Sequence, residues 1–199
     1  MNKLFTKAVI VEPRIECPTW ISEKVEYKAF VILSGQSDES DVELFLTHLF
    51  LYNGIDLDRS LKDSFNDLFN EEHVILHGGI AFFEGFERSI LPSCCCGLED
   101  IDEIRGSINK RVSPWLGHDP TPGIIYYDNY IRVCSYDPSS NHPVIFIDYT
   151  YEEIYKCLKE TRVELLDFIE GPLFSWLNQR DSDIASEMII KMKNWFVQE

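Results

Sequence analysis

Three short apolar runs follow one another between residues 123 and 149, and their spacing constrains the fold more than any other feature of the chain. The runs GIIYY and YIRVCSY are separated by Asp128-Asn129, and VIFIDY follows after the polar stretch DPSSNHP. An Asp-Asn pair between two such runs is typical of a two-residue type I′ hairpin turn. Strands this close along the chain pair most simply with their neighbours, so the pattern predicts an antiparallel β-meander.

Two helices are predicted after the meander. Thr150 and Glu153 have the spacing of a capping box, and the apolar residues behind them recur at helical spacing as far as Gly171-Pro172, where we expect the helix to end. A second stripe predicts a last helix, which would pair with the one before it. Its members are Ile184, Met188, Ile189, Met192, Trp195 and Phe196.

The first half of the chain mixes strand and helix signals. We expect strands over Lys7–Glu12, Lys24–Leu33 and the run HVILH before Gly78-Gly79. Ser40 and Glu43 predict a capped helix that ends at Gly54, an amphipathic helix follows over 57–68, and a short helix starts just after Gly97. The chain is therefore expected to form a single α+β domain over 1–199. It would have an antiparallel sheet with a β-meander, helices packed on one face and a C-terminal helical pair.

Acidic residues exceed basic ones by a wide margin. The chain of 199 residues has 34 Asp and Glu against 18 Lys and Arg, a net charge of −16. This balance disfavours nucleic-acid and anionic-membrane binding, which need a positive surface. Residues 37–72 alone have ten acids and two bases. We place this excess on the outer face of a helical hairpin, where it is either a solvated surface or a docking face for a basic protein. The residues of the hypothetical docking face are Asp38, Glu39, Asp41, Glu43, Asp63 and Asp67.

Three consecutive cysteines, Cys94 to Cys96, precede Gly97 and four acids within five residues. We expect the segment to be extended, so that Cys94 and Cys96 point to one side. The simplest interpretation is that these small side chains pack into the core and that the acids favour the N-terminus of the next helix.

Two chemical alternatives stay open for the cysteines. Cys94 and Cys96 with His118 and Asp119 could hold zinc, although the C-x-C spacing is unusual and no second knuckle complements it. Alternatively, Cys96 at a helix N-terminus could be a nucleophile, with His118 as its base and Asp119 or Glu99 as the carboxylate that orients the base. Nearby acids oppose such a thiolate. No cofactor is expected, and zinc is kept only as a hypothesis.

The loop SPWLGHDPTPG, residues 113–123, contains three prolines and two glycines, so it has no regular structure. We interpret Trp115, Leu116 and the turn at Gly117 as fixing the loop onto the core, with ligand binding as the alternative. The chain contains none of the common nucleotide-binding, metalloprotease or serine-hydrolase motifs. Their absence makes an enzyme the less expected class without excluding it.

The blocks PSCCCGLEDIDE and SPWLGHDPTP resemble a family of uncharacterised bacterial proteins that share CCCGLED and SPWLGHDP. The likeness covers about residues 90–122 and implies neither a reaction nor a catalytic residue. The acidic α+β layout is also similar to that of the SMI1/KNR4-like (SUKH) immunity proteins, a likeness of architecture alone.

Together these features predict a cytoplasmic, non-catalytic binding protein of an immunity or regulatory type. It would engage a basic protein partner through its acidic helical face and would bind neither nucleic acid nor membrane. The alternatives are a metal- or thiol-dependent enzyme centred on Cys94, Cys96, His118 and Asp119, and a structural subunit of a larger assembly.

Overall fold

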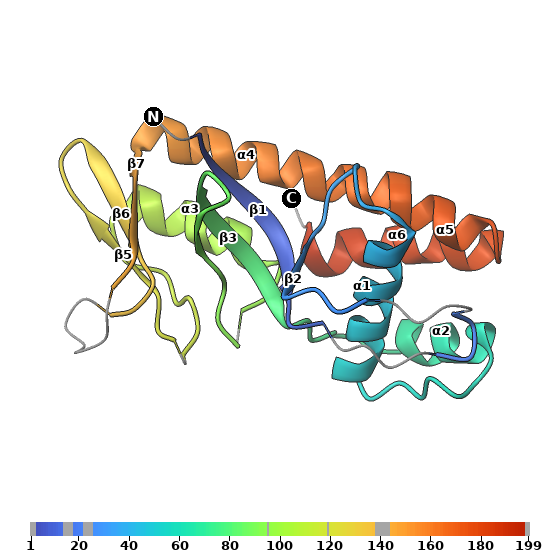
Figure 1. Cartoon of the computed structure of the whole chain (residues 1–199). Helices are drawn as coiled ribbons and strands as arrows, with labels where there is room; N and C mark the ends of the chain where they lie inside the picture. Colours follow the sequence, from blue (N-terminus) through green and yellow to red (C-terminus); the bar gives the residue numbers. More distant parts are fainter. Residues whose placement is uncertain are drawn as a thin grey trace. The chain divides into compact units, whose positions relative to one another are not determined.

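The computed structural model describes residues 3–13, 18–21, 26–94, 96–118, 120–137 and 144–197 and has the predicted α+β class (Figure 1). One antiparallel sheet has the strand order β2-β1-β3-β4, and the other has the order β5-β6-β7. The strands are β1 (Leu4–Val11), β2 (Phe30–Ile32), β3 (Gly78–Glu84), β4 (Arg88–Ile90), β5 (Gly123–Tyr126), β6 (Tyr130–Cys134) and β7 (Phe146–Thr150). The helical segments are α1 (Glu39–Tyr52), α2 (Leu61–Phe69), α3 (Asp100–Lys110), α4 (Tyr151–Phe168), the π-helical turn η1 (Ile169–Leu173), α5 (Phe174–Asn178) and α6 (Ser182–Phe196).

The chain divides into two compact units, each assembled from two stretches of sequence. Unit 1 comprises Met1–Val9 and Gly78–Val163, and unit 2 comprises Ile10–His77 and Glu164–Glu199. Each unit has its own buried apolar residues, and both contain strand and helix. The single domain expected over 1–199 stays a prediction.

The meander of unit 1 confirms the prediction from the three apolar runs. Tyr126 pairs with Ile131 in β6, so Asp128 and Asn129 lie within the tight turn, and β6 pairs antiparallel with β7. The predicted turn type is wrong, however. Among the described residues, only Glu12 and Arg111 are non-glycine residues with positive φ, whereas a type I′ turn needs positive φ at both central positions.

The strand β7 contains the residue that joins the two sheets within unit 1. The side chain of Tyr149 is fully buried against Phe82, with ring centroids 6.3 Å apart. Its hydroxyl accepts the backbone N–H of Phe83 at 3.0 Å and lies 3.1 Å from the carbonyl oxygens of Phe5 and Phe83. Burial raises the pKa of Tyr149, so the hydroxyl keeps its proton and can donate it to these carbonyls.

Unit 2 is organised around α1, which is buried almost all round. Its buried residues include Val42 and the whole run from Leu44 to Phe50. The cap of α1 is Asp38, whose carboxylate accepts the N–H of Asp41 at 2.9 Å, while Asp41 accepts the N–H of Asp38 at 3.2 Å. The capping box thus lies two residues before the predicted Ser40–Glu43 pair, and the carboxylate of Glu43 instead contacts Trp176 and Arg180.

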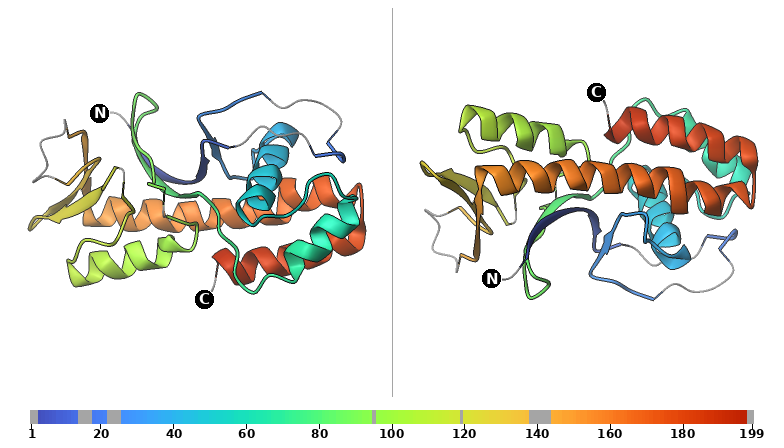
Figure 2. Two further views of the ribbon diagram at one scale, coloured as in Figure 1. Left: turned by 90° about the horizontal axis from the view of Figure 1, so that it is seen from below. Right: turned by 90° about the horizontal axis from the view of Figure 1, so that it is seen from above.

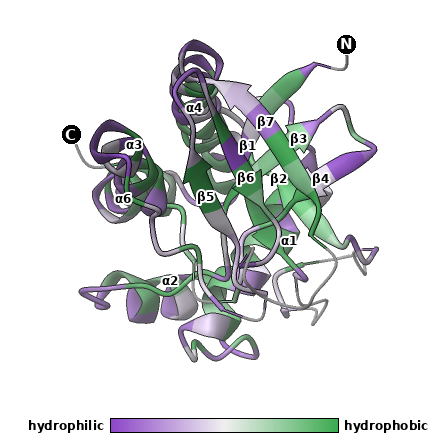
Figure 3. Cartoon of the chain, turned by 90° about the vertical axis from the view of Figure 1, so that its left-hand side faces the viewer, coloured by the Kyte–Doolittle hydropathy of each residue, from purple (hydrophilic) through white to green (hydrophobic). Residues whose placement is uncertain are grey.

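The second helix of the predicted hairpin is confirmed as α2, with Ser60 as its cap. Its buried side includes Phe65 and Leu68, and the helix shows both hydrophobic and hydrophilic colours in Figure 3. The rings of Phe50 and Phe65 meet edge to face with centroids 4.9 Å apart, so α1 and α2 are in contact.

Two predicted strands of unit 2 are shorter or absent. Within the described part of Lys24–Leu33, only Phe30–Ile32 is a strand. The run HVILH is irregular, and β3 begins after it at Gly78. The side chain of Asn53 accepts the N–H of Ile75 at 2.8 Å and donates to its carbonyl at 2.9 Å. The ring of His48 lies 2.9 Å from the carbonyl of His77. Side chains of α1 and its C-cap therefore satisfy backbone groups that a strand would have paired.

The prediction that Gly171-Pro172 ends a helix is also wrong. The chain passes through the π-helical turn η1, which contains Pro172, and continues into α5. A π turn changes the local hydrogen-bonding pattern, so the missing N–H of proline is tolerated there. The segments α5 and α6 then pack side by side (Figure 2). A C-terminal helical pair is therefore present, but its first member follows Pro172 instead of ending there.

Candidate functional site

Two segments, CCC (residues 94–96) and GHDP (residues 117–120), are brought together within unit 1 by contacts of their described residues and of Ser93. The hydroxyl of Ser93 lies 3.0 Å from the carbonyl oxygen of His118 and also contacts that of Pro120. Gly117 has φ +85°, and a Cβ placed there would lie 2.5 Å from the Cβ of Ser93 and 3.3 Å from the Sγ of Cys96. The approach is therefore too close for any side chain at position 117, which explains the glycine.

Cys94 lies in a turn, so the extended conformation predicted for the cysteine segment is wrong at this residue. The N–H of Cys96 donates to the carbonyl of Ser93 at 3.1 Å. The turn leaves Cys94 exposed and buries Cys96 to 5% exposure. The two thiols therefore lie in different surroundings rather than on one shared face, and Cys95 lies outside the described residues.

The thiol of Cys96 packs into the core, as the simplest interpretation predicts. It lines a cavity of about 10 Å³ together with Ile80, Phe82 and Leu116. Such a volume holds about one water molecule, so the cavity is too small for a substrate.

A carboxylate oxygen of Asp100 accepts the N–H of Gly97 at 3.0 Å. Burial raises the pKa of Asp100, while its hydrogen bonds to Gly97 and Cys96 oppose this effect.

The thiol of Cys94 lies beside the ring of His118, yet the two groups are farther apart than the about 2.6–3.2 Å of an activated nucleophile and its base. Its Sγ lies 3.9 Å from both ring nitrogens of His118, whereas it donates to the carbonyl oxygen of the same residue at 3.1 Å. The S–H therefore donates to a backbone carbonyl rather than to the ring nitrogen that would act as its base. Thiol chemistry at this place stays a prediction.

A metal centre depends on a residue whose position is not described. Asp119, the fourth member of the hypothetical zinc set, lies outside the described residues. Within the described ranges, no three His, Cys, Asp or Glu side chains gather in a way that could hold a metal ion. The zinc hypothesis stays a prediction.

The acids that follow the cysteines occupy the start of α3. Asp100, Asp102 and Glu103 lie in its first turn, where negative charge complements the helix dipole. This position agrees with the interpretation of the GLEDIDE segment as a helix start.

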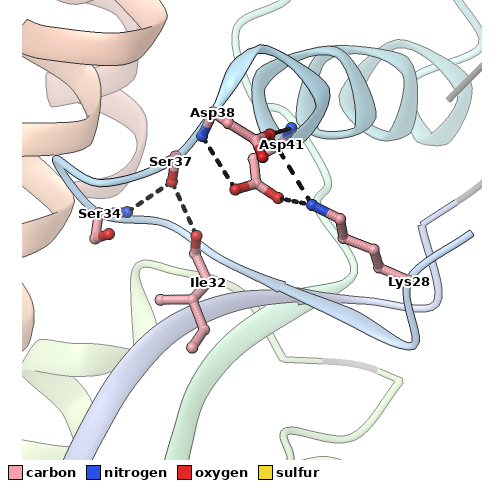
Figure 4. Close-up of polar contacts among 6 residues, drawn as sticks. All are labelled: Lys28, Ile32, Ser34, Ser37, Asp38 and Asp41. Carbon is pink, nitrogen blue, oxygen red and sulfur yellow. Dashed lines mark hydrogen bonds and ion pairs between the residues drawn. The ribbon is translucent and has the colours of Figure 1, made fainter. Parts of the chain in front are cut away.

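The acidic residues at the start of α1 stabilise the structure of unit 2 itself. Asp38 and Asp41 cap the helix, and the ammonium of Lys28 lies 2.7 Å from Asp41 and 4.0 Å from Asp38 (Figure 4). The hydroxyl of Ser37 donates to the carbonyl of Ile32 at 3.0 Å and so ties the approach to this helix to β2. Glu39, next in the chain, differs from Asp38 and Asp41: it is exposed and forms no ion pair among the described residues.

The other three acids of the hypothetical docking face also have partners within unit 2. The side chain of Glu43 is only 13% exposed, accepts the indole N–H of Trp176 at 3.3 Å and lies 4.0 Å from Arg180. Asp63 lies 3.9 Å from Arg59, which also contacts Asp67. A partner would therefore compete with existing contacts at most of these residues.

Four exposed acids that the sequence interpretation did not single out flank α2. Asp56 and Asp58 precede this helix, and Glu71 and Glu72 follow it; none forms an ion pair within the part of the chain that the structure describes. The predicted docking face lies on helices, whereas these four acids lie in loops. The high density of acids over 37–72 is the sequence signal that includes them.

Net charge is divided unequally between the units. Unit 2 contains 21 acids and 8 bases, a net charge of −13, whereas unit 1 contains 13 acids and 10 bases, a net charge of −3. Most of the acidic excess therefore belongs to one compact unit.

Comparison with known proteins finds no protein similar to this chain. No protein-family model matches the chain, and neither a curated protein nor a solved structure is significantly similar to it. The resemblance to the CCCGLED family and to the SUKH immunity proteins therefore stays a prediction. Among the described residues, no helix is long and apolar enough to cross a membrane.

Proposed function

We propose that the protein is a non-catalytic binding protein, an immunity-type or regulatory partner, whose unit 2 engages a basic protein surface. The observation that supports this proposal is the net charge of −13 in unit 2 against −3 in unit 1. Charge gathered on one unit attracts an oppositely charged partner to that unit and raises the rate of productive encounter.

Exposed acids without an internal ion pair are the residues that a partner can reach at least cost. Glu39, Asp58, Glu71 and Glu72 meet this description among the described residues. Asp41 and Glu43, in contrast, are engaged by Lys28 and by Trp176 and Arg180. Reversing those two charges would lower stability as well as binding, so they cannot test the function cleanly.

The test compares two variants of the full chain with the same net charge. One combines Glu39→Lys, Asp58→Lys, Glu71→Lys and Glu72→Lys in unit 2. The other combines four reversals at exposed acids of unit 1, namely Glu87→Lys, Glu103→Lys, Asp128→Lys and Glu152→Lys. The probe is a fluorescent synthetic peptide of alternating lysine and arginine, and its binding is followed by anisotropy at several salt concentrations.

We expect the unit 2 variant to lose about tenfold or more in affinity, equivalent to about 1.4 kcal/mol, while the unit 1 variant changes much less. Wild-type affinity should also fall steeply as salt rises. Equal losses in the two variants would show that only total charge matters and would contradict the proposal. Absence of binding by the wild type would contradict it too.

A further inference from the structure

A groove between α3 and α4 has basic side chains as half of its eight lining residues. Its volume is about 380 Å³, and it lies wholly within unit 1. The two helices run side by side there (Figure 2). Four bases and one acid line it: Arg105, Lys156, Lys159, Arg162 and Asp102. This sign of charge is unexpected in a protein with nearly twice as many acids as bases.

Helical spacing explains how the lining residues meet. On α4, Tyr155, Lys159 and Arg162 are four and three residues apart, so they share one face. On α3, Asp102 and Arg105 are three residues apart and share the opposing face. The floor consists of Ile101 and Leu158, which are 3% and 2% exposed.

Two contacts across the groove hold its walls. The hydroxyl of Tyr155 donates to the side-chain oxygen of Asn109 at 2.6 Å. A guanidinium nitrogen of Arg162 lies 3.2 Å from both carboxylate oxygens of Asp102. Both pairs join α3 to α4, so the groove is formed before any ligand enters it.

Much of the positive charge in the groove is not neutralised by the protein. Arg105 and Lys159 form no ion pair among the described residues. Lys156 lies 3.9 Å from Glu160, and both of these side chains are largely exposed, so the pair is weak. Neighbouring cations repel one another, and an anion between them would relieve that repulsion.

We propose that this groove binds the phosphate group of a small phosphate ester. Arginine matches phosphate oxygens with paired N–H donors, and lysine adds point charge. The volume lies in the usual range of small-molecule sites, about 300–1,000 Å³, and the apolar floor would accept the organic part of the ester. The inference concerns unit 1 and does not depend on the proposed function of unit 2.

The test measures binding of inorganic pyrophosphate to the full chain by calorimetry at constant ionic strength. The variant Arg105→Gln/Lys159→Gln removes the two lining cations that have no ion pair. The control Lys110→Gln/Arg111→Gln removes one lysine and one arginine from the end of α3, outside the groove lining. Arg162 is left intact because its loss would strand the carboxylate of Asp102.

We expect the groove variant to weaken pyrophosphate binding about tenfold or more and the control to change it about twofold or less. Binding of ribose 5-phosphate that shows the same pattern would support the class of ligand. Equal losses in both variants, or no binding by the wild type at millimolar pyrophosphate, would overturn the proposal. Tighter binding of a single-stranded RNA oligonucleotide than of either small molecule would overturn it as well.

Discussion

The hydroxyl group of Tyr149 is buried where β7 meets β1 and β3 and bonds to backbone groups of both strands. Tyr149→Phe would leave a buried N–H and a buried carbonyl with fewer partners, which costs about 1–3 kcal/mol. We expect a clear fall in the urea concentration at which the protein unfolds.

The matched control is Tyr151→Phe, which removes a 2.8 Å hydrogen bond to the carbonyl of Tyr127 at an exposed position. We expect this loss to cost about 0.5 kcal/mol or less, because water can replace the bond. Equal destabilisation by the two substitutions would contradict the role assigned to Tyr149.

The contact between the CCC and GHDP segments depends on the absence of a side chain at position 117. Gly117→Ala would place a methyl group 2.5 Å from the Cβ of Ser93 at a φ of +85°. We expect a loss of about 1–3 kcal/mol or more from backbone strain and the clash together. Urea unfolding measures the effect.

Gly106 in α3 provides the opposite case, because nothing lies within 4 Å of a Cβ added there. Gly106→Ala should stabilise the protein by about 0.5–1 kcal/mol, since alanine is the better helix former. A stabilising effect of both substitutions would refute the close approach at Gly117.

The start of α4 follows from a local sequence motif alone, without contacts from the rest of the molecule. The predicted capping box is present: Thr150 donates its N–H and its hydroxyl to the carboxylate of Glu153, at 2.8 and 2.7 Å. In return, the N–H of Glu153 donates to the hydroxyl of Thr150 at 3.2 Å. All the partners lie within four residues, so no distant contact could displace them.

This capping box makes stability depend on pH. The bonds from the backbone and side chain of Thr150 lower the pKa of Glu153 below its ordinary value of 4.5. The folded state therefore binds this proton less tightly than the unfolded state. The stabilisation is fully present above about pH 4.5 and is lost as the pH falls through the lowered pKa.

Glu153→Gln should consequently cost about 0.5–1 kcal/mol near pH 7 and progressively less toward pH 3. Chemical unfolding at a series of pH values measures the difference between the variant and the wild type. Glu152→Gln, one residue earlier on the same helical turn, serves as the control with a smaller effect. A difference that does not change with pH would refute this account of Glu153.

The unequal charge of the two units has a consequence for the whole molecule. Repulsion among the acids of unit 2 opposes folding and is screened by salt. We expect the free energy of unfolding to rise as sodium chloride increases from about 10 to about 200 mM. The double substitution Glu71→Gln/Glu72→Gln should make the protein more stable at low salt and should reduce that rise.

Glu87→Gln/Asp128→Asn, which removes two exposed acids of unit 1, should have the smaller effect in the same series of urea titrations. An equal effect of the two pairs would mean that the repulsion belongs to the whole chain rather than to unit 2.

The sequence alone determined those elements whose causes are local. The apolar runs and the intervening turn predicted the meander, and the Thr150–Glu153 motif predicted the start of α4. The apolar residues at helical spacing after Gly97, among them Ile101, Ile104 and Ile108, predicted α3. Each of these elements depends on interactions between residues a few positions apart, so the local sequence pattern is sufficient to predict it.

Only the tertiary structure decided the features that depend on distant groups. Asn53 satisfies the backbone at Ile75 and so removes a predicted strand, and Trp176 with Arg180 engages the carboxylate that had been expected to cap α1. The separation of Cys94 from Cys96, the meeting of the CCC and GHDP segments, and the gathering of bases between α3 and α4 are of the same kind. Hydrogen bonds and burial between residues far apart in the sequence determine which of several local conformations of similar energy is the most stable. A local sequence pattern does not contain this information.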